Sequence, residues 1–304
     1  MGAAVYGRIS GIRRAAVHDG GGVRTTVFCK GCPLRCVWCH NPESLDFRPQ
    51  IGFYPEKCIG CGTCAAVCPA GAVRREGTKP VTDPALCRGC LACAESCPAD
   101  ARIAYGTRWE AGALAEKLLA DKPFFDESGG GVTISGGECL AQPEFTAALA
   151  GTLAERGVSV DIDTCGAVPR QALERVRPFT DVFLYDLKAV DPAVHRRCTG
   201  ADNAVILDNL RYLIGCGSRV EIRCPYVPGL NDGECEKIAD WLAAARFTGK
   251  IKVLGYHGMA AGKYRALNME NTLPAVRVTP EDVDDAVRVL ESRGLHAVNG
   301  MRDD

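Results

Sequence analysis

The sequence FCKGCPLRCVWCHNPES, from Phe28 to Ser44, holds four cysteines within eleven residues. Three of them, Cys32, Cys36 and Cys39, have a spacing that recurs in iron–sulfur chemistry, and they directly follow the β-branched run VRTTVF, which predicts a strand. Three thiolates leave one iron of a four-iron cluster without a protein ligand. An open position of this kind distinguishes a reactive metal site from a closed structural one. The stretch therefore predicts a reactive cluster at the end of a strand.

Outward from this stretch, short β-branched runs alternate with amphipathic stretches. The runs with strand composition begin at Val23, Gly131, Val158, Asp181, Val220 and Lys250. The stretches with helical periodicity begin at Arg108, Pro143, Ala204 and Cys235. This alternation predicts a parallel sheet. Because six units are fewer than the eight of a full barrel, we expect a partial (βα)6 barrel, with a doubly wound open sheet as the alternative.

Two further cysteine runs form an internal repeat. CIGCGTCAAVCPAGAV and CRGCLACAESCPADAR share the pattern Cys-x2-Cys-x2-Cys-x3-Cys-Pro at an offset of 29 residues. This is the spacing of bacterial two-cluster ferredoxins, in which the fourth cysteine of each run ligates the other cluster. The alternative is a pair of zinc knuckles, whose ligands usually come as two pairs separated by a longer loop. We expect two [4Fe–4S] clusters, one held by Cys58, Cys61, Cys64 and Cys97, and the other by Cys68, Cys87, Cys90 and Cys93.

These patterns divide the chain into three parts. Residues 1–49 begin the barrel and contain the three-cysteine loop, residues 50–105 form an inserted ferredoxin-type domain, and residues 106–304 complete the barrel. A length of 304 residues with 47% hydrophobic content is sufficient for one large and one small domain.

Composition argues against several classes of protein. A formal net charge of -1 provides no field that would attract nucleic acid or an anionic membrane. Eighteen cysteines would suit a disulfide scaffold only in a short secreted chain, and the N-terminus has no long apolar core after a basic start. We therefore expect a cytoplasmic protein that uses cysteines to bind metal.

The chain resembles the activating enzymes of glycyl radical enzymes, a family within the radical S-adenosylmethionine (SAM) superfamily. Its motifs occur in the family's order: HDGGGVRTTVFCKGCPLRCVWCHNPES, SGGGVTISGGE, DTCG, DLK, TGADNAVILDNL, IRCPYVPGLND and YHGMAAGKY. The inserted domain is similar to that of the longer subgroup with two auxiliary clusters, and is absent from the short pyruvate formate-lyase activators.

This resemblance implies an activity, cofactors and partners. The open iron of the cluster on Cys32, Cys36 and Cys39 would bind SAM, and flavodoxin or ferredoxin would supply an electron. The resulting 5'-deoxyadenosyl radical would abstract a hydrogen atom from a backbone glycine of a partner glycyl radical enzyme. We also expect an anaerobic host and a monomer.

The resemblance further implies roles for individual residues. The SAM contacts would be Trp38, Cys39, His40, Gly137, Glu138, Asp186, Leu187, Lys188 and His257. Asp163 and Thr164 match a monovalent cation site, and Asp19 and Arg223 match positions that hold the partner's glycine loop. The cysteines that follow no ligand spacing are expected to behave as small hydrophobic residues; they are Cys29, Cys139, Cys165, Cys198, Cys216, Cys224 and Cys235.

Two other functions stay open on the sequence. One is a radical SAM enzyme that acts on another peptide or on a small molecule. The other is an electron carrier in which a ferredoxin domain accompanies an inert barrel, although this does not explain why the first loop lacks a fourth cysteine.

Overall fold

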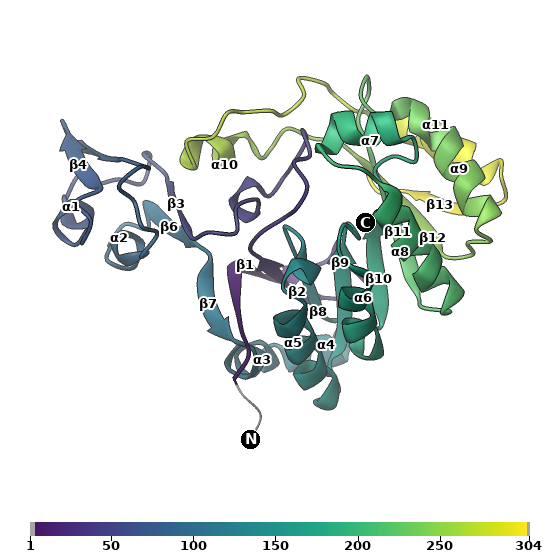
Figure 1. Cartoon of the computed structure of the whole chain (residues 1–304), viewed down its shortest axis with the longest axis horizontal. Coiled ribbons are helices and arrows are strands. Elements are labelled where there is room, and N and C mark those ends of the chain that lie inside the picture. The colour runs from purple at the N-terminus through teal and green to yellow at the C-terminus, as the bar shows by residue number, and fades with distance from the viewer. Residues whose placement is uncertain (1–3, 303–304) are drawn as a thin grey trace.

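In the computed structural model, which describes residues 4–302, nine strands form one sheet in the order β13-β12-β11-β10-β9-β8-β2-β1-β7 (Figure 1). The seven strands from β13 to β2 in this order pair in parallel, whereas β1 is antiparallel to both β2 and β7. Their bounds are β1 (Tyr6–Ala16), β2 (Arg24–Cys29), β7 (Thr107–Glu110), β8 (Gly131–Gly136), β9 (Ser159–Thr164), β10 (Val182–Asp186), β11 (Val220–Tyr226), β12 (Lys250–Gly255) and β13 (His296–Asn299).

The six strands expected from the sequence are β2 and β8 to β12, so the predicted parallel core is confirmed. The sheet is larger than predicted, because β13 adds a seventh parallel strand and β1 and β7 add an antiparallel edge. The stretch from Arg108 was expected to be helical throughout, but it begins in β7, where Arg108 pairs with Arg8. The helix starts only at Ala111, because the Glu110 side chain accepts hydrogen bonds from the first helical amides and caps it.

The helices after the strands pack on the sheet through apolar side chains. Leu149 and Leu153 on α5, and Val160 and Ile162 on β9, are fully buried in the same core cluster. The barrel helices are α3 (Ala111–Leu119), α4 (Lys122–Ser128), α5 (Pro143–Glu155), α6 (Arg170–Val176), α7 (Pro192–Thr199), α8 (Ala204–Gly215), α9 (Cys235–Ala244), α10 (Ala261–Ala266) and α11 (Pro280–Glu291). The 3-10 helices are η1 (Pro42–Ser44), η2 (Cys139–Ala141), η3 (Arg177–Phe179) and η4 (Asp232–Glu234).

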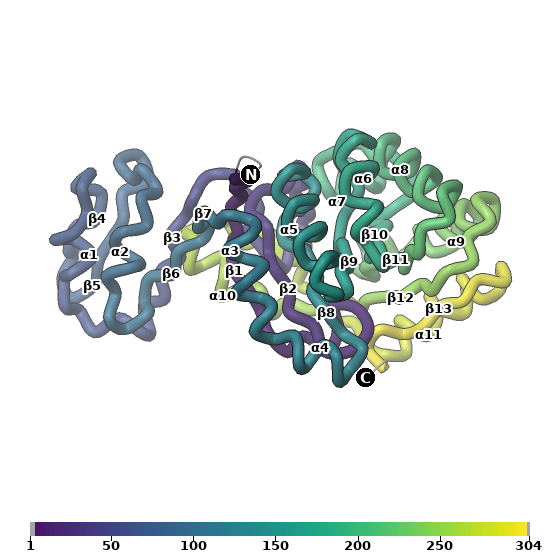
Figure 2. The backbone as a smooth tube through the Cα atoms, turned by 90° about the horizontal axis from the view of Figure 1, so that it is seen from below, coloured from purple at the N-terminus to yellow at the C-terminus, as the bar shows by residue number. Residues whose placement is uncertain are grey.

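The cysteine repeat forms a small unit at one end of the molecule, on the side opposite α9 and α11 (Figures 1 and 2). It begins at β3 (Gln50–Phe53), which pairs antiparallel with β6 (Arg102–Tyr105). Between them lie α1 (Thr63–Ala66), the hairpin of β4 (Val73–Glu76) and β5 (Lys79–Thr82), and α2 (Ala92–Glu95). The pair β3–β6 starts and ends where the insert was expected to, and we keep residues 50–105 as our proposed domain.

Within residues 4–302, every helix is too short or too polar to cross a membrane.

Candidate active site

The loop with Cys32, Cys36 and Cys39 follows β2 and is fixed by main-chain hydrogen bonds to α7. Arg35 N donates to Thr199 O at 2.8 Å, and Val37 N donates to Cys198 O at 2.9 Å. The last carbonyls of a helix have no partner within the helix, so they are free to hold a neighbouring segment. The C-terminal end of α7 therefore sets the position of the three cysteines.

The three thiols lie in one small apolar cluster. Cys32 is buried there with Leu34, Leu45 and Cys165, and Cys36 and Cys39 pack against this group. Burial raises the pKa of the Cys36 thiol to about 12 and that of Cys39 to about 11. Because metal ligation requires thiolates, loading a cluster here must release protons.

An acidic and a basic side chain from the end of β10 adjoin the loop. Lys188 Nζ lies 2.5 Å from Asp186 Oδ2, and the Lys188 side chain is only 8% exposed. Burial alone lowers the pKa of Lys188, but the Asp186 carboxylate and the Cys36 thiol more than offset this, so the net shift is upward. The ammonium group therefore stays charged beside the cysteines, where it can balance negative charge.

The Gly136-Gly137-Glu138 turn lies against the other side of the loop. A Cβ atom on Gly137 would lie 2.4 Å from Gly31 O and 2.5 Å from Ser44 O, so a larger residue does not fit. Glu138 is fully buried, and its carboxylate accepts hydrogen bonds from Cys165 N at 2.8 Å and Leu140 N at 2.9 Å. The Glu138 side chain thus points into the protein, and a contact between SAM and Glu138 would have to come from its main chain.

The segment after β12 crosses the cysteine loop. The rings of His40 and His257 stack at 4.2 Å, and His40 Nε2 lies 2.7 Å from His257 O. Lys263 Nζ donates to Glu43 Oε1 at 2.6 Å and to His40 O at 3.0 Å, and Tyr264 donates to Cys39 O. The structure thus brings the predicted SAM residues His40 and His257 together.

The remaining predicted SAM residues adjoin this group. Trp38 is 6% exposed and belongs to the main core, and Leu187 is buried, with its amide donating to Arg223 O at 2.9 Å. As with Glu138, contact between Leu187 and a ligand would come from the main chain.

A charged network lines the barrel interior below the loop. Ser135 Oγ donates to Asp163 Oδ2 at 2.5 Å, and Arg223 Nη1 lies 3.7 Å from Asp163 Oδ1. Burial raises the pKa of Asp163 to about 6, and Arg223 opposes that rise. Next to Asp163, Thr164 Oγ1 lies 2.8 Å from a carboxylate oxygen of Glu138 and is engaged as a donor.

The loop with Asp19 joins the same network. Thr26 Oγ1 donates to Asp19 Oδ2 at 2.6 Å, and Arg223 Nη2 donates to His18 O at 3.1 Å. The structure therefore brings Asp19 and Arg223 to one inner face, although they are far apart in sequence.

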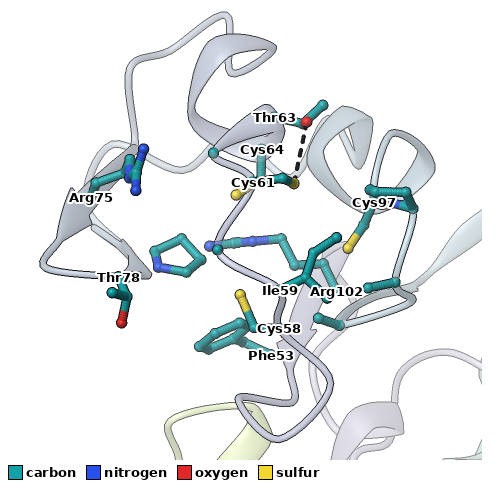
Figure 3. Close-up of a pocket in the computed structure, with 16 residues that line it drawn as sticks. Phe53, Cys58, Ile59, Cys61, Thr63, Cys64, Arg75, Thr78, Cys97 and Arg102 are labelled. Carbon is teal, nitrogen blue, oxygen red and sulfur yellow. Dashed lines mark hydrogen bonds between the residues drawn. The ribbon is translucent and has the colours of Figure 1, made fainter.

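In the insert, four cysteines surround one cavity (Figure 3). They are Cys58, Cys61, Cys64 and Cys97, the set expected to hold the first auxiliary cluster. All four line the same cavity, together with Phe53 and Arg102. This arrangement, with thiolate donors around a volume, fits a cluster better than one zinc ion.

The second set contacts both the first set and the main chain of the insert. Cys93 lies close enough to Cys87, and to Cys64 from the first set, for the charges of their thiolates to interact. The amide of Ala72 donates to Cys68 Sγ at 3.2 Å.

Sequence reasoning missed several residues around the cysteine loop. Lys30 is 1% exposed and donates to Glu43 O at 2.7 Å and to Gln50 Oε1 at 2.8 Å, so it ties the loop to the first residue of the insert. Cys165 was expected to be an ordinary hydrophobic residue, but its thiol lies 2.9 Å from Glu138 Oε2 and packs beside Cys32. The DTCG motif contained Cys165, so its place after β9 was the available signal.

Comparisons with known proteins agree with this arrangement. Residues 97–242 match the model of the Radical SAM superfamily, and residues 57–101 match that of the 4Fe-4S dicluster domain. The solved structure of TYW1 with a lysine-pyruvate adduct bound has a TM-score of 0.52 at 14% identity, covering 91% of this chain and 74% of that one. At this identity the likeness shows the fold alone.

Two curated relatives are much more similar. The benzylsuccinate synthase activating enzyme of Thauera aromatica is 41% identical, over 96% of this chain and 92% of the relative. The trans-4-hydroxy-L-proline dehydratase activating enzyme of Clostridioides difficile is 37% identical, over 95% of this chain and 97% of the relative. With relatives this similar along almost its whole length, the chain belongs to the radical SAM activating enzymes of glycyl radical enzymes.

Proposed function

We propose that Cys32, Cys36 and Cys39 hold the [4Fe–4S] cluster with which this activating enzyme cleaves SAM and generates the glycyl radical of its partner. The observation that supports this most directly is the placement of three buried thiols at the strand ends, beside the charged pair of Lys188 and Asp186. When bound, such a cluster would supply one electron to the sulfonium of SAM, which breaks the bond from sulfur to the 5'-carbon and leaves methionine and a 5'-deoxyadenosyl radical. This radical would take a hydrogen atom from the partner's backbone glycine, giving 5'-deoxyadenosine and the glycyl radical.

In this proposal the chain binds and orients SAM. The main chain at Gly137 would meet the methionyl amino group, as the resemblance implies. It lies tightly against the cysteine loop, because a side chain there would collide with Gly31 and Ser44. Lys188 and Asp186 contact the carboxylate and ribose side, and the stacked rings of His40 and His257 border the adenosyl group. The SAM-binding set is completed by Trp38, Cys39, and the main chain of Glu138 and Leu187.

The barrel interior receives the partner's glycine loop. Asp19 and Arg223 face the same inner surface, where they offer an acceptor and a donor to an extended peptide. Asp163 and Thr164 supply hard oxygen atoms for a monovalent cation, which would offset the negative charge of the SAM carboxylate.

The eight cysteines of the insert hold two further [4Fe–4S] clusters, which relay electrons inward from a flavodoxin or ferredoxin. Cys61 and Cys90 are exposed, so their clusters lie within reach of an external donor. Replacing both cysteines should abolish activity with the physiological donor and spare activity with dithionite. Full activity with the physiological donor would eliminate the relay.

The partner is a glycyl radical enzyme, as the family implies, and an anaerobic host, a cytoplasmic location and a monomeric state remain predictions. Protein reconstituted anaerobically should contain about twelve iron atoms per chain. With dithionite and SAM it should release 5'-deoxyadenosine, and with its partner it should give a glycine-centred doublet in electron paramagnetic resonance (EPR).

Cys36→Ala should lose both products. The matched control is Cys216→Ala, at an exposed cysteine outside the three sets, which should keep both. Iron-replete protein that releases no 5'-deoxyadenosine under these conditions, with its partner present, would overturn the proposal. Cleavage of SAM without any glycine-centred signal from candidate partners would instead favour another peptide or a small molecule as substrate.

A further inference from the structure

Arg102, at the start of β6, is a buried cation inside the insert. It is 3% exposed, and its Nη1 donates to Thr82 Oγ1 at 2.8 Å. Its Nε and Nη2 atoms are buried and have no hydrogen-bond partner among the described residues. An unpaired buried donor of a charged group is costly, so something that the protein side chains do not supply is expected to accept from it.

The guanidinium borders both proposed cluster sites. Arg102 lines the cavity that Cys58, Cys61, Cys64 and Cys97 surround (Figure 3). Its Nη1 atom also lies 3.9 Å from Cys93 Sγ, which belongs to the other set. The face of the Phe53 ring lies 5.3 Å from its Cζ atom and fixes the guanidinium from one side.

The internal repeat shows that Arg102 is present in only one of its two halves. The offset of 29 residues relates α1 to α2 and the start of β4 to the start of β6. It also relates positions with left-handed backbone, namely Gly60 with Gly89, Gly62 with Leu91, and Gly71 with Asp100. Under the same offset Arg102 corresponds to Val73, which is buried and apolar. One half of the repeat therefore has a hydrophobic residue where the other half places a charge between the cysteine sets.

We propose that Arg102 donates hydrogen bonds to both iron–sulfur clusters of the insert and raises their reduction potentials. Nε and Nη2 would donate to sulfur atoms of the group in the Cys58 cavity, and Nη1 to the Cys93 thiolate. This inference rests on the proposed function, because it requires that the insert hold two clusters.

The direction of the effect follows from charge. One-electron reduction adds a negative charge to a cluster, while the Arg102 guanidinium is neither oxidised nor reduced. Hydrogen bonds to sulfur and nearby positive charge stabilise the more negative, reduced form. In a buried site this interaction is poorly screened, so it exceeds that of an exposed arginine at similar range.

The test is an EPR-monitored redox titration of the full-length, iron-replete enzyme. SAM is added to a parallel set of samples, so that the cluster whose signal responds to SAM is separated from the auxiliary clusters. Arg102→Val installs the residue of the equivalent position, Val73. In this variant the one-electron equilibrium of each auxiliary cluster should shift toward the oxidised form by more than threefold, and by at least tenfold for one of them. A tenfold change corresponds to a potential about 59 mV lower.

Two variants control for charge and folding. Arg88→Val removes an exposed arginine beside Cys87 and Cys90 and should shift the equilibrium less than threefold, because solvent screens that charge. Arg102→Gln removes the charge and keeps a polar hydrogen-bond donor. It is the variant to titrate if Arg102→Val fails to hold iron. It should still shift the equilibrium more than threefold.

The outcomes separate the two proposals. The role of Arg102 alone would be overturned if Arg102→Val has full iron content and cleaves SAM normally under dithionite, while the reduction equilibrium of either auxiliary cluster stays within threefold of the wild type. The same outcome in Arg102→Gln would overturn it where Arg102→Val does not load iron. Wild-type protein whose insert binds no iron would overturn the proposed cofactor set as well.

Discussion

Replacing Asn231 by aspartate should weaken the fold and displace one wall of the SAM site. Asn231 is 4% exposed, and its amide group donates to Pro225 O at 2.7 Å and to Lys188 O at 3.0 Å. Its carbonyl oxygen accepts from Val227 N at 2.9 Å. One side chain therefore ties the end of β10, where Lys188 lies, to the end of β11.

Asn231→Asp keeps the shape of the side chain and the oxygen that accepts from Val227 N. It replaces the NH2 group, which donates two hydrogen bonds, with an oxygen that faces the carbonyl oxygens of Lys188 and Pro225. Leaving a buried acceptor without its donor costs about 1–3 kcal/mol, so two of them give about 2–5 kcal/mol when partial relaxation is allowed. At about 2–4 °C per kcal/mol for a chain of this size, the Tm should fall by at least about 4 °C. Because the Lys188 main chain loses its tether, the KM for SAM should also rise.

The assay is anaerobic thermal unfolding followed by circular dichroism, together with 5'-deoxyadenosine formation at varied SAM concentration. Asn271→Asp is the matched control, since Asn271 is exposed and uses only its oxygen, as an acceptor from Leu273 N. That variant should change stability by less than about 0.5 kcal/mol. A Tm for Asn231→Asp within about 2 °C of the wild type, with an unchanged KM, would refute the assigned role.

Three further changes have defined outcomes. Gly137→Ala should raise the KM for SAM at least tenfold, because the added Cβ collides with Gly31 O and Ser44 O; an unchanged KM in dithionite assays would contradict this. Cys165→Ala should retain full iron content, since its thiol is engaged with Glu138, and loss of one cluster by iron analysis would show that Cys165 is a ligand. Burial lowers the pKa of His195 in the folded protein below its ordinary value of 6.5. At a pH below 6.5 the unfolded state therefore binds more protons than the folded state, and the free energy of unfolding decreases as the pH falls toward the folded pKa. His195→Gln should therefore flatten the dependence of Tm on pH between 7 and 5, unlike His296→Gln at an exposed position; parallel pH profiles would argue against it.

The parallel core was predictable because strands buried on both faces consist of continuous β-branched and apolar residues. β8 and β9 are of this kind, with Val132, Ile134, Val160 and Ile162 fully buried. β1 has a half-exposed pattern with basic residues in its second half, so its composition does not distinguish it from a loop. β13 has four residues, too few for periodicity to be visible.

The candidate site was predictable in its cysteines and less so in its surroundings. Cysteine spacing is local, and three sulfur ligands of each cluster are separated by only two or three residues, so the sequence displays them directly. The bond from Lys263 to Glu43 spans 220 residues, and the one from Ser135 to Asp163 spans 28. No periodicity marks such pairs, because they depend on how the strands are ordered in the sheet.

The long-range contacts also explain how one short loop can be held firmly enough for radical chemistry. It is bound by α7 through main-chain carbonyls, by the segment after β12 through Lys263, and by the first strand of the insert through Lys30. Lys30 and Lys263 both bind Glu43, one through its main-chain oxygen and the other through its carboxylate. Movement of β3 would therefore be transmitted through Lys30 to Glu43 and from there to the cysteine loop, because Lys30 and Lys263 both use Glu43 as their anchor. In the proposed function, electron transfer from the insert and SAM binding at the loop would thus depend on one connected set of contacts.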